Sequence, residues 1–128
     1  MVPEGLQYTA EHEWIASAGD EGMVRVGITD YAQEQLGDVV FVQLPTVGDT
    51  VSPGDSIAEV ESTKSVSEIY APLAGQITAV NDDLSDSPEQ VNSDPYGSGW
   101  MFELRLADEG DRSELLDAEA YQSVIDGS

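Results

Sequence analysis

Short segments with strand character, separated by glycine turns, run through most of this chain and limit the folds that it can adopt. β-Branched and aromatic side chains mixed with polar ones are typical of half-buried strands, and Gly-Asp pairs are typical of turns. Such segments occupy residues 6–9, 13–16, 23–28, 38–44, 76–80 and 100–106, with turns at 19–22, 48–49, 54–55 and 94–99. Many short strands with glycine turns predict a mainly β sandwich or barrel.

One strand segment has apolar residues on both of its alternating faces. In residues 38–44, an extended backbone places Val39 and Phe41 on one face and Val40, Val42 and Leu44 on the other. Apolar side chains on both faces predict a strand buried on both sides, so we expect this segment to be a central strand.

Three helices are expected beside the strands. Thr29 offers a capping hydroxyl for a short helix that Gly37 ends. Residues 87–90 read Ser-Pro-Glu-Gln, a capping-box pattern with proline at the first helical position, so a brief helix should follow. A terminal helix, closed by Gly127, has its apolar face on Leu116, Ala120, Tyr121, Val124 and Ile125.

Residues 57–71 predict a hairpin. Two strand-like runs flank the small polar stretch Ser62-Thr63-Lys64-Ser65, which suits a tight turn. With Thr63 and Lys64 at the centre of the turn, Lys64 stands at the tip of a stiff hairpin with its amine in solvent. The same geometry pairs Ser62 with Ser65, Val60 with Ser67 and Ala58 with Ile69.

Lys64 is the only lysine among 128 residues, in a chain whose formal net charge is −22. A solubilising turn residue is the plain interpretation. Two observations weigh against it: positive charge is avoided elsewhere, and the turn lacks the Asn-Gly or Asp-Gly pair that hairpin stability favours. On the residues alone, a functional lysine and a solubilising one both stay open.

The composition excludes several classes of protein. A chain of 128 residues with 40% apolar residues fits one domain over residues 1–128, with a core that needs neither disulfides nor metals. The absence of cysteine excludes disulfide stapling, thiol catalysis and Cys-zinc sites. With no signal segment and no apolar run of membrane-spanning length, we expect a cytoplasmic protein.

The acidic excess is the strongest compositional signal. Asp and Glu number 26 against four Lys and Arg, which argues against binding to nucleic acid. The carboxylates are spread along the chain, and their repulsion is tolerable where salt screens it, since the Debye length is about 3 Å near 1 M salt. We hypothesise a halophilic source. A calcium site at Asp82, Asp83 and Asp86 is not favoured, because the regular ligand ladder is missing.

No set of residues for catalysis is evident. His12 is the only histidine, so a multi-histidine metal site is excluded. His12 with Glu11 or Glu13 could form a general-base pair, but beside Trp14 a hydrogen-bonded structural histidine is the stronger interpretation.

Residues 60–75, Val-Glu-Ser-Thr-Lys-Ser-Val-Ser-Glu-Ile-Tyr-Ala-Pro-Leu-Ala-Gly, resemble the lipoyl-attachment hairpin of the glycine cleavage system H-protein family. The departures are small, since Thr63 and Ser65 stand where the family more often has Val and Ala. Further motifs similar to the family lie at residues 8–14, 27–38, 39–45, 86–89, 91–92 and 94–100.

The resemblance implies a fold and a role. The fold is a flattened lipoyl/biotinyl-type β sandwich-barrel with a few short helices, including a C-terminal one. The role is that of a non-catalytic carrier with lipoic acid amide-linked to Lys64. The partners implied are a pyridoxal-phosphate glycine decarboxylase, a tetrahydrofolate-dependent aminomethyltransferase, a flavin-dependent dihydrolipoamide dehydrogenase and a lipoate-attaching enzyme. We expect a monomer that binds neither nucleic acid nor membrane.

By motif position, Glu13 and Glu68 are candidates to hold the cationic amine of the loaded arm in a surface cleft. The alternative is that both are ordinary members of the acidic shell. In the predicted register Glu59 lies opposite Glu68, a like-charge pair that normally costs stability.

Other carrier classes remain as alternatives. A biotin carrier usually has its lysine between two methionines, and a 2-oxoacid dehydrogenase lipoyl domain usually has Asp before the lysine and a Pro/Ala-rich linker. A relay that passes lipoyl groups to other acceptors is not separated by sequence from glycine cleavage. An acidic scaffold with an unmodified Lys64 is the non-carrier alternative.

Overall fold

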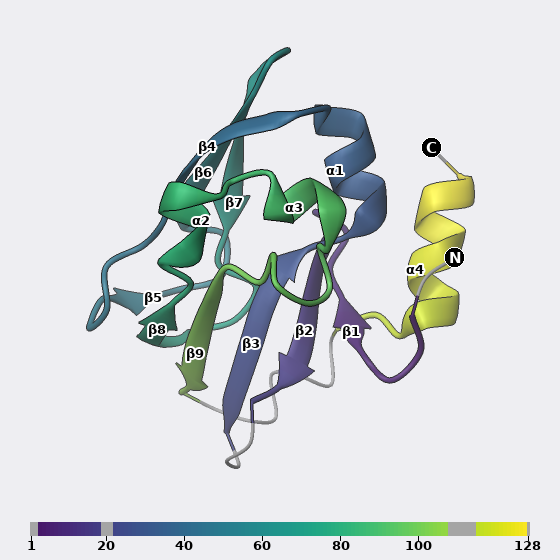
Figure 1. Cartoon of the computed structure of the whole chain (residues 1–128). Coiled ribbons are helices and arrows are strands. Elements are labelled where there is room, and N and C mark those ends of the chain that lie inside the picture. Colours follow the sequence, from purple (N-terminus) through teal and green to yellow (C-terminus); the bar gives the residue numbers. More distant parts are fainter. Residues whose placement is uncertain (1–2, 19–21, 108–114, 128) are drawn as a thin grey trace.

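Two antiparallel sheets make up most of the molecule (Figure 1). The structure is a computed structural model that describes residues 3–18, 22–107 and 115–127. Its strands are β1 (Gln7–Tyr8), β2 (Glu13–Ser17), β3 (Met23–Ile28), β4 (Val39–Gln43), β5 (Thr50–Val51), β6 (Ser56–Ser62), β7 (Val66–Tyr70), β8 (Gly75–Val80) and β9 (Phe102–Leu106). The larger sheet has the order β1-β2-β3-β9-β8-β5 and the smaller one β4-β6-β7. The predicted mainly β fold is confirmed. The turn expected at 19–22 falls mostly on residues outside the described ranges.

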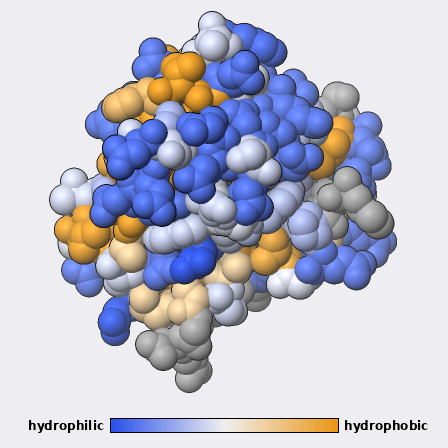
Figure 2. Space-filling view, viewed as in Figure 1, coloured by the Kyte–Doolittle hydropathy of each residue, from blue (hydrophilic) through white to orange (hydrophobic). Residues whose placement is uncertain are grey.

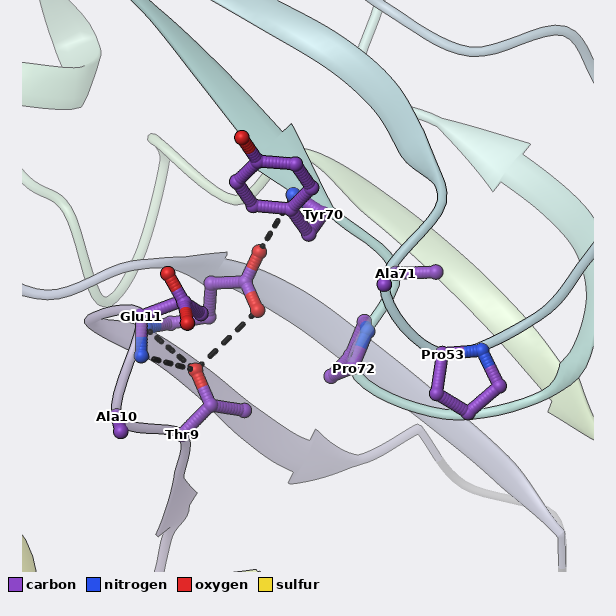
Figure 3. A pocket seen from close by; sticks show the side chains of 9 residues that line it. Thr9, Ala10, Glu11, Pro53, Tyr70, Ala71 and Pro72 are labelled. Carbon is purple, nitrogen blue, oxygen red and sulfur yellow. Dashed lines mark hydrogen bonds between the residues drawn. The ribbon is translucent and has the colours of Figure 1, made fainter.

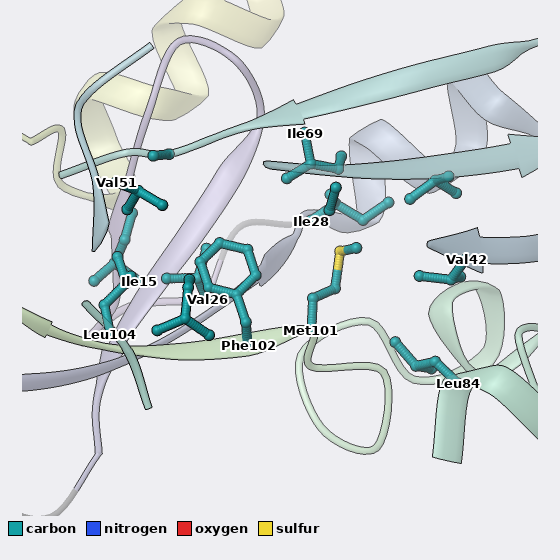
Figure 4. Packing of buried hydrophobic residues seen from close by; sticks show 14 of the residues in the cluster. Ile15, Val26, Ile28, Val42, Val51, Ile69, Leu84, Met101, Phe102 and Leu104 are labelled. Carbon is teal, nitrogen blue, oxygen red and sulfur yellow. The ribbon is translucent and has the colours of Figure 1, made fainter. Parts of the chain in front are cut away.

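The two sheets pack face to face around one apolar core (Figure 4). Where a strand is regular, alternate side chains point inward, as the two-residue period of an extended backbone requires. Ile15, Val26 and Phe102 enter the core from the larger sheet, and Val42 and Ile69 enter it from the smaller one. This packing anchors the base of the β6–β7 hairpin, whose tip projects beyond the core (Figure 1).

Four helices lie around the sheets in the described part of the chain: α1 (Asp30–Leu36), α2 (Asp83–Asp86), α3 (Gln90–Ser93) and α4 (Ala118–Asp126). The predicted first helix is confirmed at both ends. Thr29 Oγ1 accepts a hydrogen bond from the Ala32 N–H at 3.2 Å, and Gly37 ends the helix with a φ of 82°. A positive φ suits glycine because it has no Cβ.

The capping box predicted at Ser87 is wrong. Helix α2, which the sequence did not predict, ends at this residue, and the Ser87 N–H donates to the Asp83 carbonyl at 2.8 Å. Ser87 is therefore the C-cap of α2 and lies two residues before the N-cap of α3. Helix α3 does follow, but its N-cap is Glu89, whose side chain makes no capping bond.

The prediction that residues 38–44 form a buried central strand is also wrong. Strand β4 lies at the edge of the three-stranded sheet, and Val40 and Phe41 are 53% and 50% exposed. The physical reason is a β-bulge between Val39 and Phe41, where the register with β6 shifts by one residue. A bulge interrupts the alternation of faces, so consecutive residues point outward.

Helix α4 packs on β1 through a second apolar cluster. The rings of Tyr8 and Tyr121 stack with centroids 4.7 Å apart. Leu116, predicted within the terminal helix, instead precedes it and pairs with Tyr8 through two backbone hydrogen bonds of 2.8 Å. Asp117 then caps the helix by accepting from the Ala120 N–H.

The surface is mostly hydrophilic on the face shown in Figure 2. None of the helices in the described ranges has the length and apolar character needed to cross a bilayer.

Candidate functional site

Lys64 lies where the sequence placed it, exposed at the tip of the β6–β7 hairpin. The predicted pairs are present, with Val60 opposite Ser67 and Ala58 opposite Ile69. The Ser62 N–H donates to the Ser65 carbonyl at 2.8 Å and closes the turn.

Ser62 holds the turn in shape with its side chain. Its Oγ accepts hydrogen bonds from the N–H groups of Lys64 and Ser65 at 3.2 and 3.1 Å. The Ser62 hydroxyl also lies 3.1 Å from the Ser65 carbonyl, to which it donates. A small hydroxyl side chain that bonds nearby backbone groups is a recognised device for fixing turns. The tip is therefore ordered by its own residues.

The turn that follows α1 supports this tip. The Thr63 N–H donates to the Asp38 carbonyl at 3.0 Å. A Cβ placed on Gly37 would lie 3.1 Å from Lys64 Cε, so the lysine stem passes directly over the glycine backbone. The absence of a side chain at Gly37 leaves room for that stem.

Asn92 fixes the turn from the other side. Its Oδ1 accepts from the Val39 N–H at 2.8 Å, and its Nδ2 donates to Gln33 Oε1 and to the Gly37 carbonyl, both at 2.9 Å. One amide thereby joins α3, the end of α1 and the start of β4. The sequence placed Asn92 in a motif but gave no sign of this role, because its partners come from segments more than 50 positions away.

Glu13 is buried rather than free in a cleft. It is 1% exposed, and both carboxyl oxygens have partners. Thr9 Oγ1 donates to Oε1 at 3.3 Å, and the Tyr70 N–H donates to Oε2 at 3.1 Å (Figure 3). Burial raises the pKa of Glu13 from 4.5 to about 8. Burial therefore favours the protonated form of this carboxyl.

Glu68 lies in a different environment. Its side chain is exposed, and it accepts from the Ser56 hydroxyl at 3.1 Å and the Tyr70 hydroxyl at 3.2 Å. Glu59 lies opposite Glu68, as the register predicted. The hydrogen bond from the Tyr70 hydroxyl to Glu68 raises the pKa of Tyr70, because ionised tyrosine would lose that bond.

Two open pockets border these carboxylates. The pocket beside Glu13 has a volume of about 540 Å³, and Figure 3 shows Thr9, Glu11 and Tyr70 around it. The pocket beside Glu68 has a volume of about 330 Å³. Glu11 lines both pockets. The structure thus puts the two candidate carboxylates in neighbouring pockets, joined through Tyr70, which bonds Glu13 with its amide and Glu68 with its hydroxyl.

His12 has a structural environment. Its Nδ1 lies 2.8 Å from the Tyr121 hydroxyl, which is also 2.7 Å from Thr29 Oγ1. Its ring lies against Tyr31, and burial lowers the pKa of His12, which disfavours the charged form. These contacts confirm the prediction of a hydrogen-bonded structural histidine, whose partner is Tyr121 of α4.

The residues of the hairpin tip fit an acyl group on the lysine. Across the described ranges Lys64 Nζ makes no ion pair, whereas Arg25 pairs with Glu103 at 2.8 Å. Converting the Lys64 amine to a neutral amide would therefore break no salt bridge. No cluster of three or more metal-ligating side chains occurs among the described residues.

Comparison with known proteins gives one consistent result. The family model described as Glycine cleavage H-protein matches residues 6–127. The Glycine cleavage system H protein of Micrococcus luteus is 62% identical over 122 residues, with 95% of each chain covered. That of Nocardia farcinica is 60% identical, with 99% of this chain and 98% of the relative covered. The crystal structure of a glycine cleavage system H protein from Mycobacterium marinum matches with a TM-score of 0.87 and 49% identity, covering 99% of this chain and 100% of that one. This chain belongs to the glycine cleavage H-protein family.

Proposed function

We propose that Lys64 is the residue that carries the lipoyl group, as an amide on Nζ. As a member of its family, the protein is the lipoyl-carrying shuttle of the glycine cleavage system and is not itself an enzyme. The proposal for Lys64 rests mainly on one observation: the only lysine of the chain stands exposed on an ordered turn.

The hairpin supplies position rather than chemistry. When bound, the lipoyl group supplies a redox-active disulfide that can accept and release a one-carbon amine unit. The turn bonds of Ser62 and the Thr63 link to Asp38 hold the root of the arm in place. A lysine and lipoyl chain reaches on the order of 10–15 Å from that root at about 1.5 Å per bond. The arm can therefore visit catalytic sites that the carrier itself never enters.

We further propose that the pockets beside Glu13 and Glu68 receive the cationic end of the loaded arm. Exposed Glu68 is available to an ammonium group, while Glu13 holds the end of β7 and, being buried, favours its protonated form until a cation is near. A cation close to Glu13 favours its charged form and lowers its pKa again. Glu68 would hold the amine with an exposed carboxylate, and Glu13 with a carboxyl that ionises when the cation is near.

If these pockets receive the amine, removing the charge of either carboxyl should shorten the life of the loaded arm. Glu68→Gln should shorten the half-life of the aminomethyl-loaded protein about two- to tenfold, since one charge-assisted contact is weakened. Glu13→Gln should have the same sign. Release of formaldehyde from loaded parent and variants measures the half-life, with Glu119→Gln on α4 as the control. Equal half-lives in all four proteins would exclude the cleft.

The partner enzymes, the cellular compartment and the oligomeric state of the carrier complete the proposal. We propose that the partners are the glycine decarboxylase, the aminomethyltransferase, the dihydrolipoamide dehydrogenase and an enzyme that attaches lipoate, all in the cytoplasm. The absence of cysteine supports a reducing compartment. We also propose residues 1–128 as a single carrier domain that works as a monomer.

Intact mass tests the attachment site. Protein purified from its own cells during glycine catabolism should carry the mass of one lipoyl group, and peptide mapping should place it on Lys64. Lys64→Arg keeps the charge but offers no acylable amine, so it should stay bare and fail to support glycine cleavage. Native protein that is wholly unmodified, or that carries biotin, would overturn the proposal.

A further inference from the structure

Exposed apolar side chains gather beside the hairpin tip. Within the described ranges four large apolar residues are exposed, and three of them belong to the small sheet: Val40, Phe41 and Val66. We call these three residues the apolar platform. Figure 2 shows an apolar patch near the top of the molecule, where the hairpin projects in Figure 1, within a hydrophilic surface. Apolar side chains grouped on an acidic surface indicate a contact site.

The sheet register gives the platform a defined chemical pattern. Phe41 of β4 lies opposite Glu61 of β6, and Glu61 lies opposite Val66 of β7. One row across three strands therefore reads apolar, acidic, apolar. The next row on the same face of the sheet contains Glu59 opposite Glu68. A matching surface would offer apolar side chains with Lys or Arg between and around them.

This pattern argues against a second copy of the chain. Each molecule carries a formal charge of −22, and pairing two platforms would bring their glutamates together. Like charges placed against each other cost binding free energy. The occupant is therefore a different protein with a basic rim.

The position of the platform narrows the choice among enzymes that act on the arm. Val66 lies two residues beyond Lys64, so their Cα atoms are at most about 7 Å apart. The lysine side chain extends only about 6 Å, so an enzyme that reacts at Nζ itself must cover the neighbouring surface. An enzyme that reacts at the far end of a lipoyl arm works on the order of 10 Å further away and need not touch it.

We propose that the apolar platform is the docking surface for the enzyme that acylates Lys64. This inference rests on the proposed role of Lys64. In the reaction, the neutral Nζ attacks the carbonyl carbon of an activated lipoyl donor such as lipoyl adenylate, which the enzyme forms from lipoate and ATP with release of pyrophosphate. A C–N bond forms, the C–O bond to AMP breaks with its electron pair, and the amine proton passes to solvent.

The test measures acylation of the bare full-length protein by a lipoate ligase with lipoate and ATP, followed by intact mass. The double variant Phe41→Ser/Val66→Thr should raise the KM for the carrier about tenfold and leave kcat within about twofold, because docking is weakened while the amine is unchanged. Val47→Thr is the matched control. Val47 is 55% exposed, like Val66 at 57%, but lies beside Gly48, which bonds to β8 at the other end of β4.

Other measurements distinguish docking of the acylating enzyme from misfolding, from docking of the dehydrogenase and from dimer formation. Thermal unfolding of the double variant should match the parent within a few degrees. Once fully loaded, the variant should be reoxidised by dihydrolipoamide dehydrogenase at the parental rate. The proposal is overturned by an unchanged KM for acylation, by a loss confined to the dehydrogenase step, or by a parent dimer that Phe41→Ser dissociates. Failure of the Lys64 assignment is a separate result, in which the parent itself gains no lipoyl mass at residue 64.

Discussion

Glu13 belongs to a sequence motif and is also buried, and the burial cannot be read from the motif. Its place in the Glu-His-Glu-Trp motif marked it as a candidate, but one of its two hydrogen-bond partners, Tyr70, lies 57 positions away along the chain, and only Thr9 is local. From the sequence, Glu13 and Glu68 are both candidates, and the like-charge pair with Glu59 favours Glu68 of the two. The structure separates them, because one is buried with both oxygens bonded and the other is exposed.

The raised pKa of Glu13 predicts a pH dependence of folding. Between pH 4.5 and about 8 the unfolded chain has lost this proton while the folded protein keeps it. Stability from this group is therefore greatest below pH 4.5 and falls as pH rises towards 8, by at most about 1.4 kcal/mol per pH unit. Above pH 8 the contribution is constant.

Urea unfolding of the parent and Glu13→Gln at fixed salt from pH 5 to 9 measures this contribution. The difference in unfolding free energy, parent minus variant, should fall with pH and level off above about 8. Glu61→Gln, at an exposed position, is the control and should give a much flatter difference. Parallel curves for parent and Glu13→Gln would contradict a raised pKa in the folded state.

Among the elements, the hairpin was predictable and the corner beneath it was not. The β6–β7 register follows from a local pattern, because a short turn fixes which residues face each other. Strand β4 was misassigned, because its apolar run reflects a bulge that exposes Val40 and Phe41 rather than burial on both faces. Long-range contacts, such as those of Asn92, have no local signature.

The Asn92 contacts predict that the corner after α1 controls the hairpin tip. In Asn92→Asp the side chain can no longer donate to Gln33 and Gly37, and its charge faces their oxygens. We expect a loss of about 1–3 kcal/mol in unfolding free energy. Hydrogen exchange of the Thr63 amide, which bonds Asp38 next to Gly37, should also speed up.

Gln35→Glu controls for the added charge, since Gln35 is an exposed residue of α1. It should change neither the unfolding free energy by more than about 0.5 kcal/mol nor the exchange of Thr63. If Asn92→Asp behaves like this control, the corner does not depend on Asn92.

For the whole molecule, composition predicts the acidic surface better than it predicts the arrangement of strands. The formal charge of −22 is spread over the chain, and the ion pair between Arg25 and Glu103 in the described ranges offsets little of it. The halophilic source stays a prediction, which neither the fold nor the relatives address. It concerns repulsion between many exposed carboxylates, which depends on salt.

Thermal unfolding against KCl concentration tests that prediction. The midpoint should rise as KCl increases from about 0.1 M to 1 M, because the Debye length shortens from about 10 Å to 3 Å. Replacing KCl with an equal osmolarity of sucrose controls for osmotic effects and should not reproduce the salt response of charge repulsion. A midpoint that is equally high at low salt would count against an acidic shell adapted to salt.

The bulge in β4 has a consequence for aggregation when the carrier is surrounded by other proteins. An edge strand with regular backbone geometry can recruit strands of other chains and seed aggregates. Because β4 is interrupted between Val39 and Phe41, its free edge is a poor template for such growth. The protein can thus expose the apolar side chains of β4 to a specific partner while its interrupted edge disfavours non-specific strand pairing.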